Sequence, residues 1–171
     1  LRAHNAVQDN LESTLVVVGG HSDPLKNRYK AIIDEIGIRN VNFTGFVSRA
    51  ELNALYSSAC GLAFPSKCEG FGFPALEAMA HGCPVIAGNV TALPEVVGDA
   101  GILIDPENPS ELAQAMHLLI SRPDVRELLA KKGLDRAKIF TWEKTAQRTI
   151  EVWEQICQKK KLTAKSLETC L

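Results

Sequence analysis

The sequence has no excess of one charge and no cysteine pattern that indicates a metal or redox site. Its 171 residues carry a formal net charge of −1, which argues against nucleic acid as a partner and against membrane binding through charge alone. The five cysteines are odd in number, and no two have the C-x-x-C spacing of a zinc or redox site. We therefore expect reduced thiols and a binding function that depends on a local group of residues.

Long apolar runs are also missing. No run approaches the roughly 20 residues of a transmembrane helix, and the N-terminal stretch LRAHNAVQDN has neither the basic region nor the apolar core of a signal peptide. The first residue is leucine rather than methionine, from which we expect a chain cut from a longer protein. We expect a cytoplasmic location, at the inner face of the membrane if a domain outside this chain associates with it.

Short β-branched runs alternate with helical stretches along the chain. TLVVV (14–18) and CPVIAG (83–88) are apolar without strict alternation, as expected of strands covered on both faces by helices. This order predicts βαβ units and a parallel sheet. The expected fold is α/β, a Rossmann-like doubly wound sheet over residues 1–156, followed by a polar C-terminal tail over residues 157–171.

Proline and glycine mark the expected ends of several helices. Pro74 fits the first turn of one helix and Gly82 its end, while Gly133 is expected to stop a later one. A last helix begins near Thr141 and presents an apolar face to a core or an interface. The residues of that face are Trp142, Ala146, Ile150 and Trp153.

Two glutamates, Glu69 and Glu77, flank a glycine-rich turn that leads from a strand into a helix. Gly70 and Gly72 let a ligand approach backbone amides where the helix begins, and a helix N-terminus favours phosphate. A carboxylate repels phosphate but accepts hydrogen bonds from sugar hydroxyls. A ligand with a diphosphate, a ribose and a hexose satisfies both requirements, so the stretch predicts a nucleotide-sugar site.

This stretch allows other interpretations. Either glutamate alone fits a solvated loop or a favourable position in the helix dipole. Gly70, Gly72 and Ala75 also satisfy the dinucleotide pattern G-x-G-x-x-A. That pattern requires an acid after the next strand, and this strand ends in Gly88 and Asn89. The match is therefore treated as accidental.

The run EGFGFPALEAMAHGCPVIA, followed by LPEVVGDAGILIDP, closely resembles the C-terminal, donor-binding domain of retaining GT-B glycosyltransferases of family four, the glycosyl transferases group 1. The resemblance extends over nearly the whole chain, through VVVGG, VNFTGFV and the FTW that opens the last helix. It implies transfer of a hexose from a nucleoside diphosphate sugar to an acceptor hydroxyl, with retention. The family holds the base largely through backbone atoms, so UDP, GDP and ADP all stay open. The stretch TALPEVVGDAG looks most like mannosyltransferases and favours GDP-mannose, with a UDP-sugar as the alternative.

The resemblance also implies roles for individual residues. Glu69 takes the catalytic position, against the donor sugar hydroxyls, and Glu77 binds the ribose. Backbone amides around Phe71, Gly72 and Phe73 meet the sugar and diphosphate. Main-chain groups of Phe46 and Val47, at the end of a strand, hold the nucleobase. The glycine pair Gly19 and Gly20 lines the same crevice, and His21 beside it is left without a role.

The chain lacks the basic residues that the family usually places around the phosphates of the donor. Family members usually carry an arginine and a lysine in a loop after their first strand, but Arg2 is the sole cation between Leu1 and Val18. That strand, its loop and the acceptor-binding N-terminal domain are expected to be missing. We expect a folded but inactive fragment, with the acceptor glycan, lipid or small molecule, and any peripheral membrane association, belonging to the missing domain.

No metal or other cofactor is expected, because the helix N-terminus and basic side chains neutralise the phosphates in the resembling enzymes. Two further functions stay open. Sugar-nucleotide 2-epimerases share the architecture and bind the same kind of donor. A non-catalytic module that retains nucleotide-sugar affinity is the third possibility.

Overall fold

The computed structural model describes residues 1–8, 13–20 and 23–168. Within these ranges helices and strands alternate as far as β5, and the helices α6, α7 and α8 then follow one another, as the sequence predicted. The helices are α1 (Arg2–Asn5), α2 (Asp23–Ile36), α3 (Arg49–Ser58), α4 (Phe73–Ala80), α5 (Leu93–Val97), α6 (Pro109–Ser121), α7 (Pro123–Ala137) and α8 (Trp142–Glu168). The strands are β1 (Leu15–Val18), β2 (Val41–Gly45), β3 (Leu62–Phe64), β4 (Val85–Gly88) and β5 (Ile102–Ile104).

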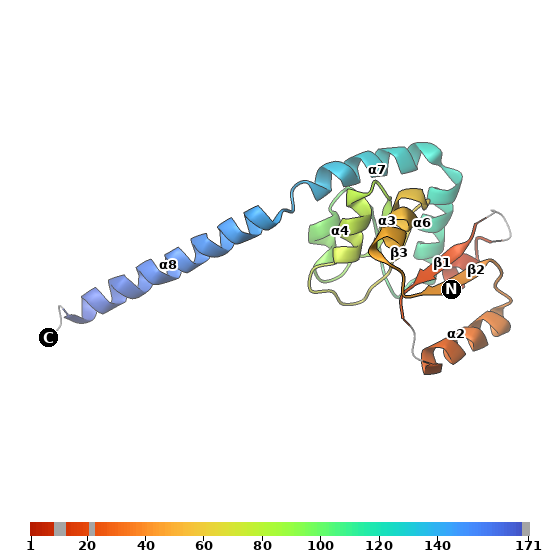
Figure 1. The fold of residues 1–171 in the computed structure, drawn as a ribbon, viewed down its shortest axis with the longest axis horizontal. Coiled ribbons are helices and arrows are strands. Elements are labelled where there is room, and N and C mark those ends of the chain that lie inside the picture. The colour runs from red at the N-terminus through yellow and green to blue at the C-terminus, as the bar shows by residue number, and fades with distance from the viewer. Residues whose placement is uncertain (9–12, 21–22, 169–171) are drawn as a thin grey trace. The chain divides into compact units, whose positions relative to one another are not determined.

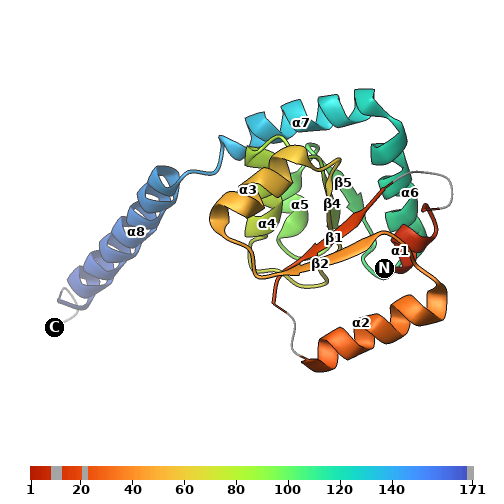
Figure 2. The same ribbon diagram turned by 45° about the vertical axis from the view of Figure 1, so that its right-hand side comes forward.

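The strands form two parallel sheets. β1 pairs with β2, and β4 lies between β3 and β5. Helices cover both sides: α4 and α5 lie on one side of β4 and β5, and α6 lies on the other (Figures 1 and 2). The parallel, Rossmann-like architecture predicted from the sequence is thus confirmed. Among the described residues no strand pairs with the second edge of β1 or of β3.

The core is built around β4, in which every residue is buried. Val85 and Ala87 point into a cluster with Met79 of α4 and Val97 of α5, and Ile86 points to the other side, toward α6 and α7. This is the two-faced burial that the apolar run 83–88 predicted. Because side chains of a strand alternate between its faces, this single strand joins both helical layers.

Gly133 does not end a helix, contrary to the sequence prediction. It lies within α7, where a Cβ would come within 3.2 Å of the Met79 side chain. The glycine therefore allows α7 to pack closely on α4. Pro74 and Gly82 do mark the ends of α4, since Pro74 lies in its first turn and Gly82 follows it at φ 70°.

The chain divides into two compact units, Leu1–Ala137 and Lys138–Leu171. The expected domain boundary at residue 156 does not coincide with this division, and residues 157–168 continue α8 instead of starting a separate tail. The expected apolar face of α8 is exposed, with Trp142 at 74% and Trp153 at 63%. Within the described residues, no helix is long and apolar enough to cross a membrane.

α1 contains the buried histidine His4. Its side chain is 1% exposed, its Nε2 lies 3.3 Å from Ser13 Oγ, and its Nδ1 has no hydrogen-bond partner among the described residues. Burial lowers the pKa of this imidazole, a backbone contact with Ser13 opposes the shift, and the positive N-terminus adds to it. Burial therefore favours the neutral form of His4 in the folded state, and its neighbours Ala3 and Val7 pack against Ala113 of α6.

We predict that His4 makes the protein less stable as the pH is lowered. The pKa is lower in the folded than in the unfolded state, so the unfolded chain binds the proton first as pH drops. The contribution is fully present above the ordinary histidine pKa of about 6.5 and is lost below it. Urea unfolding above and below this pH should show a lower free energy of unfolding at the lower pH, both in the native chain and in the control His117→Gln, whose histidine is exposed. In His4→Gln this pH dependence should become smaller. A pH dependence equal to that of the native chain would contradict the assignment to His4.

Candidate functional site

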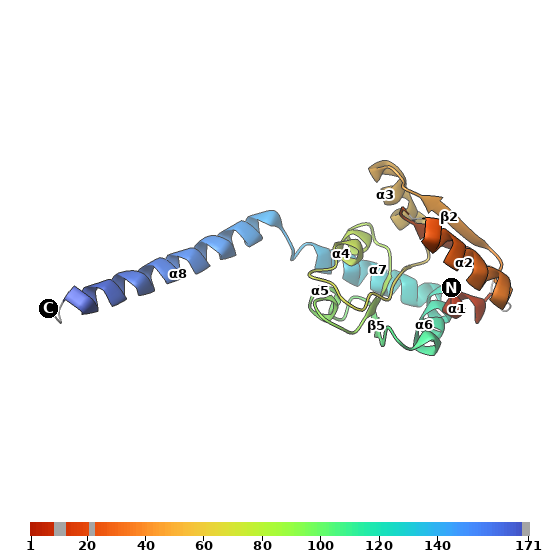
Figure 3. The same cartoon turned by 90° about the horizontal axis from the view of Figure 1, so that it is seen from below.

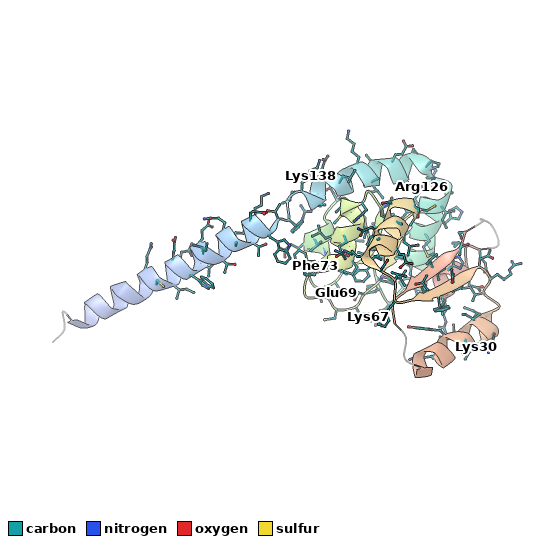
Figure 4. The ribbon with its side chains drawn as sticks, in the orientation of Figure 1. Lys30, Lys67, Glu69, Phe73, Arg126 and Lys138 are labelled. Atoms are coloured by element: carbon teal, nitrogen blue, oxygen red, sulfur yellow. The ribbon has the colours of Figure 1, made fainter. Side chains whose placement is uncertain are left out.

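The predicted donor site begins where β3 ends, in the loop that leads to α4. Glu69 is half-buried there, and its carboxylate oxygen Oε1 accepts a hydrogen bond of 2.8 Å from Ser66 Oγ. Its backbone N–H donates to Thr91 Oγ1, 3.1 Å away in the loop after β4. Figure 4 shows Lys67, Glu69 and Phe73 along this loop and the start of the helix. Two neighbouring βα loops therefore hold Glu69 in place.

Thr91, which the sequence analysis did not single out, takes part in this site through its hydrogen bond with Glu69. Its backbone has φ 52°, which is unusual for a residue with a β-branched side chain. This conformation accompanies the hydrogen bond from Glu69, so the residue links the two loops. A β-branched residue at positive φ gives no signal in the sequence pattern, which is why the role was missed.

α4 begins at Gly72, its N-cap, which has φ 104°. The Gly72 carbonyl accepts hydrogen bonds from Ala75 N at 3.0 Å and Leu76 N at 3.2 Å. Next to it, the rings of Phe71 and Phe73 lie 4.8 Å apart, and half of Phe73 is exposed. The open N-terminus of α4 thus has the partial positive charge that favours a phosphate, beside an exposed aromatic surface.

Glu77 lies in the second turn of α4 and forms an ion pair with Arg49. The distance between Arg49 Nη1 and Glu77 Oε1 is 2.9 Å, and 27% of the Glu77 side chain is exposed. Arg49 is the first residue of α3, shortly after Phe46 and Val47. This arginine could not be predicted from the sequence, because an ion pair between two helices has no fixed spacing.

The remaining predicted residues lie at the carboxyl ends of β1 and β2. Gly19 N donates to Gly45 O at 2.9 Å, and Phe46 is 91% exposed beside Gly20. Val47 is half-buried, and His21 falls outside the described residues. The carboxyl ends of parallel strands are where ligands bind in this kind of fold, so both groups of predicted residues occupy suitable edges.

A cavity of about 670 Å³ adjoins this second group, between α2 and β2. Tyr29 of α2 stacks on Phe43 of β2, with ring centroids 5.7 Å apart. Figure 3 shows α2 running alongside β2. Lys30 and Phe46 also line the cavity, which therefore combines aromatic surface with the ammonium group of Lys30.

No group of three or more metal-ligating side chains occurs in the part of the chain that the structure describes. Two cations next to the predicted site are engaged by acids: Arg49 by Glu77, and Lys67 by Glu107 at 2.7 Å. Both pairs have exposed members, so a bound anion could recruit either cation.

The family model for glycosyl transferases group 1 matches residues 1–122. The chain belongs to the group 1 glycosyltransferases. Two relatives have mannosyl transfer in their names: O-antigen chain mannosyltransferase B of Escherichia coli, 42% identical over 116 residues, and MMP alpha-(1->4)-mannosyltransferase of Mycolicibacterium hassiacum, 39% identical over 129 residues. These matches cover 67% and 72% of this chain, but 30% and 31% of the relatives.

Solved structures agree with this family and with the GT-B fold. A sucrose-phosphate synthase from Thermosynechococcus elongatus superposes with a TM-score of 0.79 and 28% identity, over 92% of this chain and 42% of that one. The C-terminal domain of a group 1 glycosyltransferase from Francisella tularensis gives 0.71 and 29%, over 81% of this chain and 75% of that one. This group 1 chain thus has the fold of a GT-B C-terminal domain and spans about a third of the length of its named relatives.

We predict that Gly72 is required for the start of α4 and that Gly70 is not. A Cβ at residue 72 would lie 2.6 Å from Leu93 Cδ2, and the backbone there has a positive φ. Gly72→Ala should lower the free energy of unfolding by about 1–3 kcal/mol. Gly70→Ala, where a Cβ would meet nothing within 4 Å, should change it by less than about 0.5 kcal/mol. Urea unfolding checks both, and equal losses would contradict the prediction.

Proposed function

We propose that this chain is the donor-binding part of a retaining glycosyltransferase that moves a hexose from a nucleoside diphosphate sugar to an acceptor hydroxyl. The observation that carries the proposal is the arrangement at the start of α4. Glu69 is held by Ser66 and Thr91 before the helix, and Glu77 is half-buried inside it. Two oriented acids around one helix N-terminus suit a ligand that contains both a diphosphate and sugar hydroxyls.

The two acids have different tasks in this proposal. Glu77 accepts hydrogen bonds from the ribose hydroxyls, and Glu69 faces the hydroxyls of the transferred sugar, near the reacting carbon. The diphosphate lies between them, at the N-terminus of α4, where partial positive charge stabilises the charge that grows on the leaving nucleoside diphosphate. Both acids therefore bind and orient the donor.

The phosphates are neutralised without a metal in this mechanism. The helix N-terminus supplies part of the charge, and Lys67 stands in the same loop. The names of the two mannosyltransferase relatives support mannose as the transferred sugar and GDP-mannose as the donor. The base is read by main-chain groups near Phe46 and Val47.

The 171 residues are proposed to bind the donor without turning it over. The matched stretches cover 30% and 31% of the two relatives, and the acceptor is assigned to the part that this chain does not contain. In a doubly wound sheet with the order 3-2-1-4-5-6, one strand lies between the positions that β1 and β3 hold here. We assign that position, and the basic loop after it, to a preceding strand of the whole enzyme.

The proposal predicts that the chain binds a nucleoside diphosphate and that Glu77 is needed for it. Ligand-observed NMR titrations with GDP, UDP and ADP, and with their hexose derivatives, should show one preferred base. Glu77→Gln should weaken that binding about tenfold or more, because a hydrogen bond to a charged group contributes about 1.5–3 kcal/mol. The substitution keeps the size of the side chain and removes its charge.

Glu127→Gln is the matched control, since Glu127 is an exposed glutamate on α7. It should leave the affinity unchanged. Absence of binding to all three nucleotides by a folded chain, or equal binding by Glu77→Gln and the native protein, would refute the assignment of the ribose to Glu77.

A further inference from the structure

Arg49 is fixed at the start of α3 by a capping box. Ser48 Oγ accepts from Glu51 N at 3.2 Å, and Glu51 Oε2 accepts from Ser48 N at 2.6 Å. These two bonds satisfy donors that the first turn of a helix otherwise leaves unpaired. The helix start is therefore well defined, and with it the position from which the arginine side chain extends.

The packing of α3 directs Arg49 toward α4. Arg49, Leu52 and Tyr56 are spaced three and four residues apart and so share one helical face. Leu52 and Tyr56 pack in the same cluster as Met79 of α4, and the Tyr56 ring lies 5.8 Å from that of His81, just after α4. The face that carries Arg49 is thus the face that α3 presents to α4.

The ion pair leaves part of the Glu77 side chain exposed. Arg49 Nη1 contacts Oε1, and 27% of the Glu77 side chain remains open to solvent. Burial raises the pKa of Tyr56, and the negative charge of Glu77 raises it further while Arg49 opposes this effect. Tyr56, Glu77 and Arg49 therefore lie close enough to interact electrostatically.

We propose that Arg49 is a positioning residue for donor recognition: it holds Oε1 of Glu77 so that Oε2 faces the ribose hydroxyls. This inference rests on the proposed function and adds a residue to it. Through this pair the segment after β2, which carries Phe46 and Val47, is joined to the helix that carries Glu77.

The pair has little influence on folding, which makes the proposal testable. Arg49 has 68% of its side chain exposed, and exposed ion pairs contribute little to stability. Arg49→Ala should therefore fold normally, and Arg49→Lys keeps the charge but not the planar guanidinium. A change in binding can then be assigned to the site and not to a loss of structure.

The test compares GDP with 2′,3′-dideoxy-GDP, with UDP or ADP and their dideoxy forms in place of GDP if one of them is the preferred base. The native 171-residue chain should prefer the ribonucleotide about tenfold or more, since the dideoxy form cannot donate to Glu77. Arg49→Ala should weaken ribonucleotide binding about fivefold, leave dideoxynucleotide binding within about twofold, and so reduce the preference. Arg49→Lys should restore part of it.

Arg122→Ala is the control, because Arg122 is an exposed arginine whose Nη2 lies 2.7 Å from Asp124 Oδ2. It should change neither affinity. A native chain that binds both nucleotides equally would overturn the proposed function itself. A native chain that prefers the ribonucleotide, with the same preference or a tighter one in Arg49→Ala, would overturn the role of Arg49 and leave the proposed function standing.

Discussion

The turn at Gly72 is the constraint on which the rest of the site depends. Its backbone has φ 104°, and the space that a side chain would fill is taken by Leu93 of α5. This conformation directs the chain from the Glu69 loop into α4 and leaves the N-terminus of the helix open. Glu77 then follows in the second turn, so one backbone geometry sets the direction of both acids and the place where an anion is favoured.

The surrounding core gives this turn its stability. β4 is buried on both faces and carries helices on either side, while its end passes close to the loop: a Cβ on Gly88 would lie 2.5 Å from Ser66 O. Ser66 in turn donates to Glu69. Glu69, the acid nearest the proposed reacting carbon, is therefore connected through Ser66 to the buried strand β4.

The features of the fold that depend on local sequence could be predicted, and those that depend on tertiary contacts could not. The burial of residues 83–88 and the limits of α4 follow from local composition, because apolar runs, Pro74 and Gly82 act through the backbone itself. Gly133 was misread because a glycine that ends a helix and one that permits close helix packing look the same in sequence. Arg49 and Thr91 were missed because their partners lie on other elements, and such contacts depend on the tertiary fold. The roles of Glu69 and Glu77 came from the family resemblance and stay predictions.

The most direct test of the central claim is to map the nucleotide on the folded chain. Backbone amide shifts of the isotope-labelled protein, recorded during a titration with its preferred nucleoside diphosphate, report which amides the ligand approaches. The account predicts the largest changes at Gly70, Gly72 and Phe73, with a second group at Gly20 and Phe46. Changes confined to α6 and α7, with none at the start of α4, would contradict it.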